Sequence, residues 1–283
     1  MNNSLWSDAM HRLTRNKAAM LSGCVLILLI IAAVLAPWIT PYGYEEMDFN
    51  NLRAIPPSAD HLLGTDTSGR DLLTRILYGA RVSLLVGFVA TGVALVIGVS
   101  WGIIAGYVGG KVDQVMMRIV DVLYGLPFII FIILLMVVFG SNLWLLFAAI
   151  GAVEWLTMAR IVRAQVIGLK NQEFVMAAKA MGVSNLSLFR RHLLPNILGP
   201  IAVYATLTIP QVMLLESFLS FLGLGIQPPM SSWGSLINDG VQYMEEHSWL
   251  LIFPGITFTI TLFALNFFGD GLRDALDPKT TDN

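Results

Sequence analysis

The chain has 283 residues, of which 56% are hydrophobic and 13% are charged. Soluble domains carry roughly 25% charged residues, so this composition excludes an ordinary soluble protein and indicates an integral membrane protein. The formal net charge of −2 argues against nucleic acid as a partner. A single cysteine, Cys24, lies in an apolar segment and supports neither a disulfide framework nor a metal site.

Six segments are long and apolar enough to cross a hydrocarbon layer of ~30 Å as helices. They occupy residues 18–40, 82–108, 120–140, 143–159, 197–221 and 249–269. Pro127 falls within the third segment, where we expect it to kink the helix. The sequence therefore predicts an all-α membrane protein with six transmembrane helices, a single membrane domain and no soluble catalytic domain.

The first of these segments follows Arg12, Arg15 and Lys17, as the apolar part of a signal peptide would. Its uncharged stretch runs from Ala18 to Tyr44, whereas the apolar part of a signal peptide has roughly 7–15 residues. We therefore expect residues 18–40 to remain as a membrane anchor.

The distribution of lysine and arginine predicts the orientation, because cytoplasmic loops are enriched in both. With the N-terminus inside, all but four of the 17 basic residues fall in the cytoplasmic tails and loops, at 1–17, 109–118, 160–196 and 270–283. The remaining four lie in the outer loop 41–81, and the outer loop 222–248 has none. We expect both termini to be cytoplasmic and residues 82–269 to form a five-helix core.

The outer loop contains a segment, GTDTSGRDLLTRILYGAR at 64–81, that begins as a turn and continues with a helical pattern. Asp66 or Thr67 can cap a short helix with leucine and isoleucine on one side. Gly79 can end that helix. The pattern predicts a short helix lying on the outer membrane interface, separate from the span at 82–108.

The second span carries Gly98, Gly102 and Gly106, which recur at every fourth residue on one helix face. Small residues at this spacing let another helix approach closely, although glycine is also simply tolerated in membrane helices. We expect this face to pack against a neighbouring span.

Asp121 and Glu154 fall within predicted spans, where an uncompensated charge costs ~2.5–3.5 kcal/mol. Both lie toward the cytoplasmic ends of their spans in the predicted topology. Each can reach water or pair with Arg118 or Arg160, and we expect structural pairing.

Glu216 is the third carboxylate within a span, and Ser217 and Ser220 follow it. These three residues are candidates for the translocation pathway. The alternative is that Glu216, near the outer end of its span, extends its carboxylate to the outer interface.

The polar segment QEFVMAAKAMGVSNLSLFRRHLLPN, at 172–196, has the pattern of two short helices joined by a glycine. The first is predicted from about Asn171 to Met181, with Phe174, Ala178 and Met181 on one face. Gly182 follows at a position that commonly ends a helix.

The second helix of this segment can be capped by Ser184 or Asn185 and closed by Pro195. A basic amphipathic hairpin of this kind can lie on anionic lipid or bind another protein. The segment lacks the wide apolar face and tryptophans of interfacial helices, and its alanines and glycine offer a low surface for contact. We therefore favour docking to a protein.

Ala177 and Ala178, followed by Gly182 and then by Leu194 and Pro195, resemble the coupling loop of ATP-binding-cassette (ABC) importer permeases. In that family the loop forms short helices that dock into a groove of a separate ATPase subunit. Met176 stands where the family usually has glutamate, and His192 where it usually has isoleucine. Glu173, nearly one turn earlier, is our candidate to supply the missing charge.

Longer segments extend the resemblance over almost the whole chain. Residues 64–75, SFLSFLGLGIQPPMSSWGSLINDG at 217–240 and NFFGDGLRDALDPK at 266–279 resemble the peptide-import branch of the family. GGKVDQVMMR at 109–118 and LWLLFAAIGAVEWLTMARIVR at 143–163 most resemble the C-type permeases of oligopeptide importers.

The resemblance implies a type I ABC importer permease fold and a subunit of an ATP-driven oligopeptide importer in the cytoplasmic (inner) membrane. Relatives that carry dipeptides, glutathione or nickel are the alternatives. The implied partners are a second homologous permease, two ATPase subunits and an extracytoplasmic peptide-binding protein. For the outer helix within 64–81 we favour a structural role, and contact with the binding protein is the alternative. The implied coupling residues are Glu173, Ala177, Ala178, Gly182, Leu194 and Pro195.

The chain has no phosphate-binding loop of its own, because Gly109-Gly110-Lys111 is followed by Val112 and lacks the first glycine at the required spacing. We therefore expect no cofactor in this chain, with ATP and magnesium bound by the partner ATPase subunits.

Two other classes of protein fit the sequence less well. A secondary transporter that uses the carboxylates as ion carriers predicts inverted repeats, and the sequence has no convincing one. An intramembrane hydrolase would need Asp121 and Asp270 to face each other within the membrane, but both are predicted near helix ends. The chain also has neither an H-E-x-x-H nor a G-x-S-x-G motif. We expect no enzymatic activity in this chain.

Overall fold

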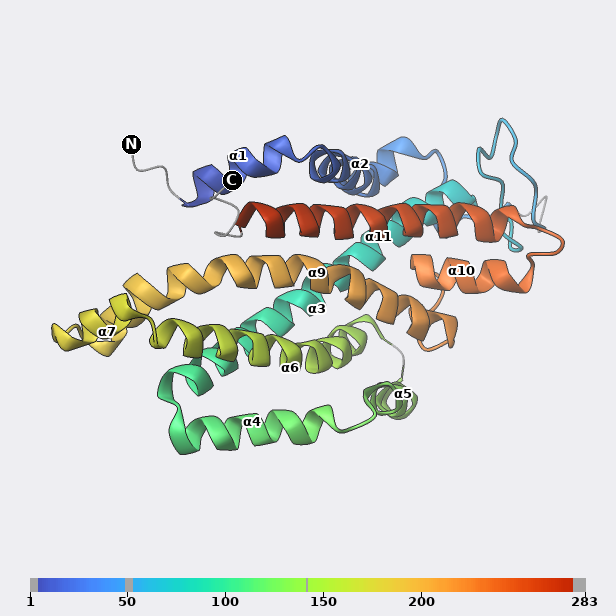
Figure 1. Cartoon of the computed structure of the whole chain (residues 1–283). Coiled ribbons are helices and arrows are strands. Elements are labelled where there is room, and N and C mark those ends of the chain that lie inside the picture. Colours follow the sequence, from blue (N-terminus) through green and yellow to red (C-terminus); the bar gives the residue numbers. More distant parts are fainter. Residues whose placement is uncertain (1–4, 49–52, 141, 277–283) are drawn as a thin grey trace.

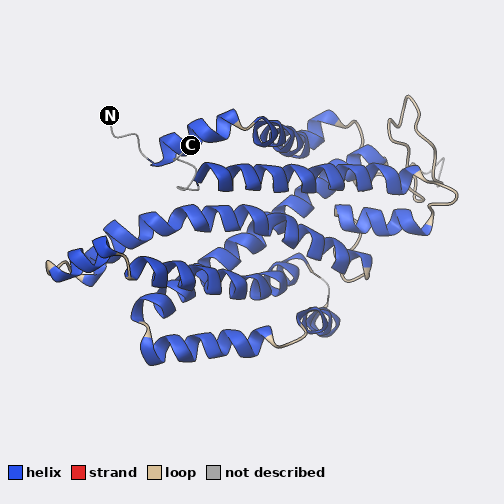
Figure 2. Cartoon of the chain, in the orientation of Figure 1, coloured by secondary structure: helices blue, strands red, loops and turns tan. Residues whose placement is uncertain are grey.

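The computed structural model describes residues 5–48, 53–140 and 142–276, and these residues form helices and loops without a β-strand (Figure 2). Five helices are long and apolar enough to span a membrane: α2 (Lys17–Ile39), α3 (Leu72–Val108), α6 (Leu143–Lys170), α9 (Leu194–Phe221) and α11 (Trp249–Leu276). A sixth span results when the bent pair α4 (Gly110–Tyr124) and α5 (Phe128–Phe139) is counted as one. The all-α fold is therefore confirmed, with five membrane-spanning helices, or six when the bent pair is counted as one span.

The third crossing differs from the single kinked helix predicted for residues 120–140. The helix already begins at Gly110, and α4 and α5 meet at an angle of 73°. Pro127 has no N–H to continue the hydrogen-bond ladder, and it follows Gly125, which already ends α4. Proline at this position breaks the helix instead of kinking it.

The outer helix predicted at 64–79 is not a separate element, because α3 runs without interruption from Leu72 through Gly79 to Val108. Its N-cap is Asp71, whose carboxylate accepts the backbone N–H of Thr74 at 2.8 Å, and not Asp66 or Thr67. Gly79 keeps a helical backbone and lies against the start of α10 (Trp233–Gln242), near Ser232. The small size of Gly79 allows close packing against α10. The prediction that Gly79 ends a helix was therefore wrong.

With 37 residues and a rise of about 1.5 Å per residue, α3 is longer than one membrane crossing requires. It crosses the molecule diagonally behind α9 and α6 (Figure 1). This inclination brings α3 into contact with α2, α6, α9 and α10, so it forms the centre of the bundle.

The close contact between α3 and α6 depends on the glycine face of α3. A Cβ atom on Gly98 would lie 2.6 Å from the Cβ of Met158, and one on Gly102 would lie 2.6 Å from the carbonyl oxygen of Ala159. A Cβ on Gly106 would lie 2.9 Å from the carbonyl oxygen of Arg163. All three distances are too short for a side chain, so the two backbones touch only because these residues are glycines.

Two spans extend further toward their polar ends than the apolar pattern predicted. α6 continues past residue 159 to Lys170, and α11 continues past residue 269 to Leu276. In α6, Arg163 is held by Asp113 of α4 through contacts of 2.5 Å and 2.6 Å. The tail expected at 270–283 is thus partly helical, and residues 277–283 lie outside the described residues.

Two further helices were not predicted. α1 (Leu5–Arg15) packs Ala9 and Leu13 against Ala275 at the end of α11. α10 begins with a capping box in which Ser232 and Ser235 exchange hydrogen bonds with each other's backbone N–H. Both helices are short and amphipathic, so hydropathy alone does not reveal them.

A proline within α2 explains one contact between spans. Pro37 has no N–H to offer the carbonyl oxygen of Ala33, one helical turn earlier. Arg81 of α3 donates its Nε–H to that oxygen at 2.5 Å and a terminal N–H to the oxygen of Val34 at 2.8 Å. The arginine thereby ties α2 to α3 and satisfies a carbonyl that the proline leaves free.

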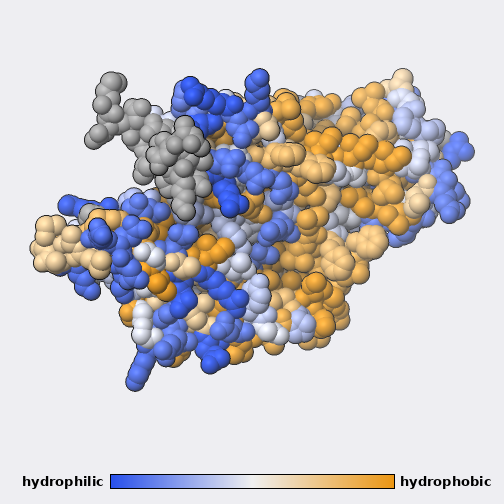
Figure 3. Space-filling model, viewed as in Figure 1, coloured by the Kyte–Doolittle hydropathy of each residue, from blue (hydrophilic) through white to orange (hydrophobic). Residues whose placement is uncertain are grey.

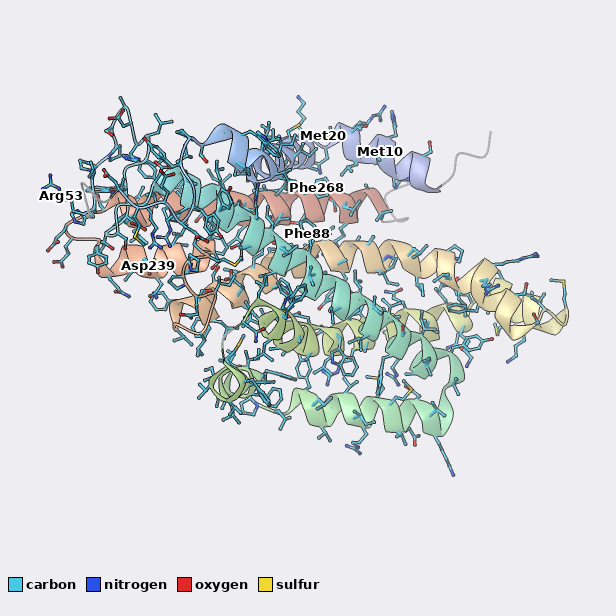
Figure 4. The ribbon with its side chains drawn as sticks, turned by 180° about the vertical axis from the view of Figure 1, so that it is seen from behind. Met10, Met20, Arg53, Phe88, Asp239 and Phe268 are labelled. Carbon is cyan, nitrogen blue, oxygen red and sulfur yellow. The ribbon has the colours of Figure 1, made fainter. Side chains whose placement is uncertain are left out.

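α1 and the end of α11 lie together at one end of the bundle, which α7 (Glu173–Ala180) also occupies (Figure 1). The surface has a broad apolar region with hydrophilic side chains gathered toward the two ends (Figure 3). Viewed from behind, Arg53 and Asp239 lie at one end and Met10 lies toward the other (Figure 4). The molecule thus has two polar ends separated by a lipid-compatible belt.

Candidate functional site

The segment between α6 and α9 forms a helical hairpin that projects beyond the bundle at the end where α1 and the end of α11 lie (Figure 1). It consists of α7 (Glu173–Ala180), α8 (Asn185–Leu188) and a π-helical turn, η1 (Phe189–Leu193), that leads directly into α9. We call residues 172–195 the coupling hairpin.

Gly182 forms the bend of the coupling hairpin, with a φ of +79°. Its N–H donates to the carbonyl oxygen of Lys179, and the N–H of Val183 donates to that of Ala178. These bonds close the end of α7 in the left-handed conformation that only glycine adopts readily. No atom lies within 4 Å of the position of a Cβ at Gly182, so the requirement is for backbone conformation and not for space.

One face of α7 holds the hairpin to the bundle. Val175 and Ala178 are buried and pack with Leu188 and Leu193 from the second half of the hairpin. The same cluster includes Tyr107, Leu169, Val183 and Phe189. The hairpin is therefore packed against Tyr107 at the end of α3 and Leu169 at the end of α6.

The opposite face of α7 is exposed, and it carries apolar side chains that the sequence pattern did not single out. Phe174 is 43% exposed, Met176 54% and Met181 78%. Phe174, Ala178 and Met181 were predicted to share one face, but they differ in burial: Ala178 is buried together with Val175, whereas Phe174 and Met181 are exposed. The i, i+3 pair Val175–Ala178 was the available signal.

Glu173, Ala177 and Lys179 lie among these exposed residues. We call this surface, centred on Met176, Ala177 and Met181, the exposed tip. Patches of apolar side chains with charged neighbours are typical of protein interaction sites.

Leu194 and Pro195 lie in the first turn of α9, where the structure corrects the expectation that Pro195 closes a helix. The chain stays helical through the proline. In the preceding π turn the N–H of Leu194 donates to the carbonyl oxygen of Phe189. Because the first N–H groups of a helix have no partner within it, proline is tolerated there, and the wider π turn joins the two helices without a break.

A cavity of about 610 Å³ opens on the side of the bundle, between the break separating α4 from α5 and the helices α6 and α9. Its wall combines apolar residues with five polar side chains. These are Tyr124, Glu154, Thr157, Tyr204 and Gln211.

Asp121 and Glu154, the two carboxylates for which pairing was expected, differ in the structure. Asp121 accepts a hydrogen bond from Arg160 at 2.8 Å, as expected. Glu154 is half-buried on the cavity wall and has no ion pair or hydrogen bond with the described residues, so for Glu154 the expected pairing was wrong. The two arginines of α6 bind other carboxylates: Arg160 binds Asp121 and Arg163 binds Asp113.

Glu216 does not reach the outer interface and does not line the cavity, because it is fully buried among helices. Ser220 donates to its carboxylate at 2.7 Å, and Ser217 lies 3.5 Å from the other oxygen. Ser220 in turn lies 3.3 Å from Ser232, the N-cap of α10. The three candidate pathway residues therefore form a hydrogen-bonded junction between α9 and α10.

A second polar cluster organises the end of the molecule that carries α10. Asp66 accepts hydrogen bonds from Arg75 at 2.6 Å and Arg70 at 2.7 Å, and both Asp66 and Arg75 are buried. Asp71 binds His61 at 3.0 Å. The extended loop before α3 is thus fixed by ionic contacts to the first turns of α3.

Among the residues that the structure describes, no three histidine, cysteine, aspartate or glutamate side chains lie close enough together to hold a metal ion. The sites described above consist of an exposed apolar tip, a cavity and two buried polar junctions.

Comparison with known proteins identifies the family. Residues 98–282 match the family described as "Binding-protein-dependent transport system inner membrane component", and residues 4–57 match the "N-terminal TM domain of oligopeptide transport permease C". The chain is 53% identical to the "Oligopeptide transport system permease protein OppC" of Haemophilus influenzae over 277 residues, 98% of this chain and 89% of that protein.

Two further relatives cover the same length. The protein of the same name in Escherichia coli K12 is 51% identical, over 98% of this chain and 92% of its own. The "Dipeptide transport system permease protein DppC" of Bacillus subtilis is 47% identical, over 98% of this chain and 86% of its own.

Among solved structures, the fold is similar to a chain of the MetNI methionine ABC transporter in an inward-facing conformation. The TM-score is 0.59, and the match covers 71% of this chain and 96% of that one at 20% identity. The family match over residues 98–282 and the relatives that align along nearly the whole chain agree. This chain belongs to the binding-protein-dependent inner-membrane components, the permease family of ABC importers.

Proposed function

We propose that this chain is a membrane-spanning permease subunit of an ATP-driven importer that carries oligopeptides across the cytoplasmic membrane. Relatives named as oligopeptide permeases, at 53% and 51% identity, support the substrate class. The dipeptide permease at 47% identity makes dipeptides the second candidate. The observation that carries the proposal is the coupling hairpin, which packs against the ends of α3 and α6, continues into α9 and presents an exposed apolar tip.

The orientation follows from charge. The end with the termini and the coupling hairpin holds most of the lysines and arginines, so both termini and the hairpin face the cytoplasm. The loop before α3 and helix α10 then face outward, where an extracytoplasmic peptide-binding protein delivers cargo.

The coupling residues have separable roles. Ala177 and Glu173, on the exposed side of α7, contact one of two ATPase subunits, which bind ATP and magnesium. Ala178 anchors α7 to the bundle, and Gly182 sets the angle between the two halves. Leu194 and Pro195 join the hairpin to α9.

Closure of the ATPase subunits pushes the hairpin toward the membrane. The buried contacts of Val175 and Ala178 pass this movement to α6, and η1 passes it to α9, with which it is continuous. These two helices form part of the cavity wall. The cavity side faces a second, homologous permease, so that peptides pass between the two subunits.

The test is purification from gently solubilised native membranes with a tag at the C-terminus. We expect ATPase subunits and a second permease to co-purify with ATP hydrolysis, and to be lost when residues 172–195 are replaced by a flexible linker of equal length. Reconstitution with the binding protein should then give ATP-dependent uptake of tri- to pentapeptides. Uptake of dipeptides alone would select the second candidate, and a chain that purifies without an ATPase would refute the proposal.

A further inference from the structure

The cavity between the α4–α5 break, α6 and α9 has the size of a ligand site. Its volume of about 610 Å³ falls within the range of roughly 300–1,000 Å³ that is common for binding pockets. The helix break supplies the space, since α5 turns away from α4 by 73° at Gly125–Pro127. Most of the wall is apolar, and the polar side chains come from α4, α6 and α9.

Glu154 is the only fully charged side chain on this wall, all of whose residues are described. It lies near the middle of α6 and is half-buried. Both arginines of α6 bind other carboxylates. Arg160 binds Asp121 at 2.8 Å and stacks on the ring of Tyr124 at 4.3 Å, while Arg163 binds Asp113.

A carboxylate in a span without a partner costs ~2.5–3.5 kcal/mol when it faces hydrocarbon, so it must face water or a cation. The other polar groups on the wall are the hydroxyls of Tyr204 and Thr157 and the amide of Gln211. Hydroxyl and amide oxygens accept hydrogen bonds from ammonium and guanidinium groups, and the Tyr124 ring offers an aromatic face.

We infer that this cavity is a cation-binding subsite of the translocation pathway, in which Glu154 holds an ammonium or guanidinium group of a peptide in transit. This inference rests on the proposed function. The group has two sources, the peptide N-terminus and the side chains of lysine and arginine. A single half-buried carboxylate gives a contact of moderate strength, which attracts the peptide and still releases it.

The first test measures the electrostatic field in the cavity without any transport. Gln211→Cys is introduced with Cys24→Ser, and the assembled importer in membranes is treated with a cationic or an anionic methanethiosulfonate reagent. Mass spectrometry of this chain gives the rate of modification at position 211. We expect the cationic reagent to react preferentially, and the preference to fall roughly fivefold with Glu154→Gln.

Asp274→Asn is the matched control, since it removes an exposed carboxylate at the far end of α11. It should leave the preference unchanged. An unchanged preference in Glu154→Gln, or no modification at position 211 in any variant, would overturn the inference. Because no uptake is measured, this test of the charge in the cavity does not depend on whether the substrate is a peptide.

The second test measures uptake by the reconstituted importer and separates the two sources of cation. Three tripeptides are compared. The first has a free N-terminus and no charged side chain, and the second is its N-acetylated form. The third is N-acetylated and carries one lysine. For each peptide, the uptake rate of the Glu154→Gln importer is divided by that of the unaltered importer. The binding protein's preference among the peptides then cancels, because it affects both rates equally.

A roughly fivefold to tenfold loss confined to the free N-terminus identifies the terminal ammonium as the ligand, and a loss confined to the lysine peptide identifies the side chain. An equal loss for all three peptides would overturn the inference and make Glu154 a structural residue. Loss of the second permease from the Glu154→Gln complex, with an unchanged reagent preference, would assign the carboxylate to the interface between subunits. Absence of uptake by the unaltered importer would count against the proposed function and leave the reagent test valid.

Discussion

The role of Gly182 depends on its backbone conformation, and the role of Asp66 depends on the charge of its side chain. Gly182 has no neighbour near the position of a Cβ, yet its φ of +79° excludes most side chains. Asp66 has the opposite character: its backbone is ordinary, and its carboxylate neutralises Arg75, whose side chain is only 3% exposed. The first residue controls the shape of a surface feature and the second controls a buried charge.

Gly182→Val should uncouple uptake from ATP hydrolysis. A β-branched residue in the left-handed region costs about 1–2 kcal/mol, which lowers the population of the correct bend by roughly tenfold. Insertion into the membrane should not change, because no packing is disturbed. The measurement is the number of peptides imported per ATP hydrolysed, at equal abundance of the importer.

Gly182→Asn is the matched control, since asparagine tolerates a positive φ better than other non-glycine residues. It should retain most of the coupling. Normal coupling in Gly182→Val would show that the bend has no role.

Asp66→Asn should destabilise the polar end that carries α10. The change leaves the buried charge of Arg75 without its partner, which costs about 3 kcal/mol or more. We expect a lower midpoint of thermal unfolding in detergent, whereas Glu246→Gln, at an exposed position of the same end, should have no effect. The double substitution Asp66→Asn with Arg75→Met should recover part of the loss, and an additive result would contradict the pairing.

At the scale of elements, the bundle depends on where helices continue and where they break. α3 and α6 can lie backbone to backbone because Gly98, Gly102 and Gly106 present no side chains at their contact. α4 and α5 diverge because Pro127 interrupts the hydrogen-bond ladder. The first feature makes a rigid pair of spans, and the second opens the cavity beside them.

Gly102→Val should disrupt the contact between α3 and α6. A Cβ there would lie 2.6 Å from the carbonyl oxygen of Ala159, so the helices must separate, at a cost of about 1–3 kcal/mol. The fraction of protein that remains monodisperse after heating in detergent should fall. Gly92→Val is the matched control in the same helix, because no atom lies within 4 Å of its Cβ position. Equal losses in the two variants would show that the contact is not specific.

At the scale of the whole molecule, the coupling hairpin and the loop before α3 lie at opposite ends of the bundle (Figure 1). The spans α6 and α9 connect the hairpin to the cavity. A force applied at the exposed tip can therefore reach the cavity through packed helices, without a flexible linker in between.

Met181→Asp should weaken the association with the ATPase subunits. Met181 is 78% exposed on the tip, and a charge there would be desolvated in an apolar interface, lowering affinity by about tenfold. The measurement is the amount of ATPase that co-purifies as the detergent extract is diluted. Met230→Asp, at an exposed methionine outside the hairpin, should have no effect, and equal retention in both variants would argue against contact at the tip.

The number and approximate position of the spans could be predicted, because transfer of apolar side chains into lipid is a local property that sums along the chain. The bend at Gly182 was predictable for a similar reason, since a glycine between two amphipathic patterns has a local conformational role. The extension of α6 to Lys170 and α11 to Leu276 was not, because polar residues can continue a helix when neighbouring helices hold them. Gly79 was taken for a helix end, although it is a point of close packing against α10.

The sequence by itself determined the membrane class, the family and the hairpin with its glycine, since hydropathy, charge distribution and short motifs are carried by neighbouring residues. Only the tertiary structure decided which partners and surroundings the three carboxylates within the spans have. Asp121 pairs with Arg160, Glu216 accepts hydrogen bonds from serines, and Glu154 lies on a cavity wall without a partner among the described residues. The physical reason is that the state of a charge within a span depends on which helices surround it, and those neighbours come from distant parts of the chain.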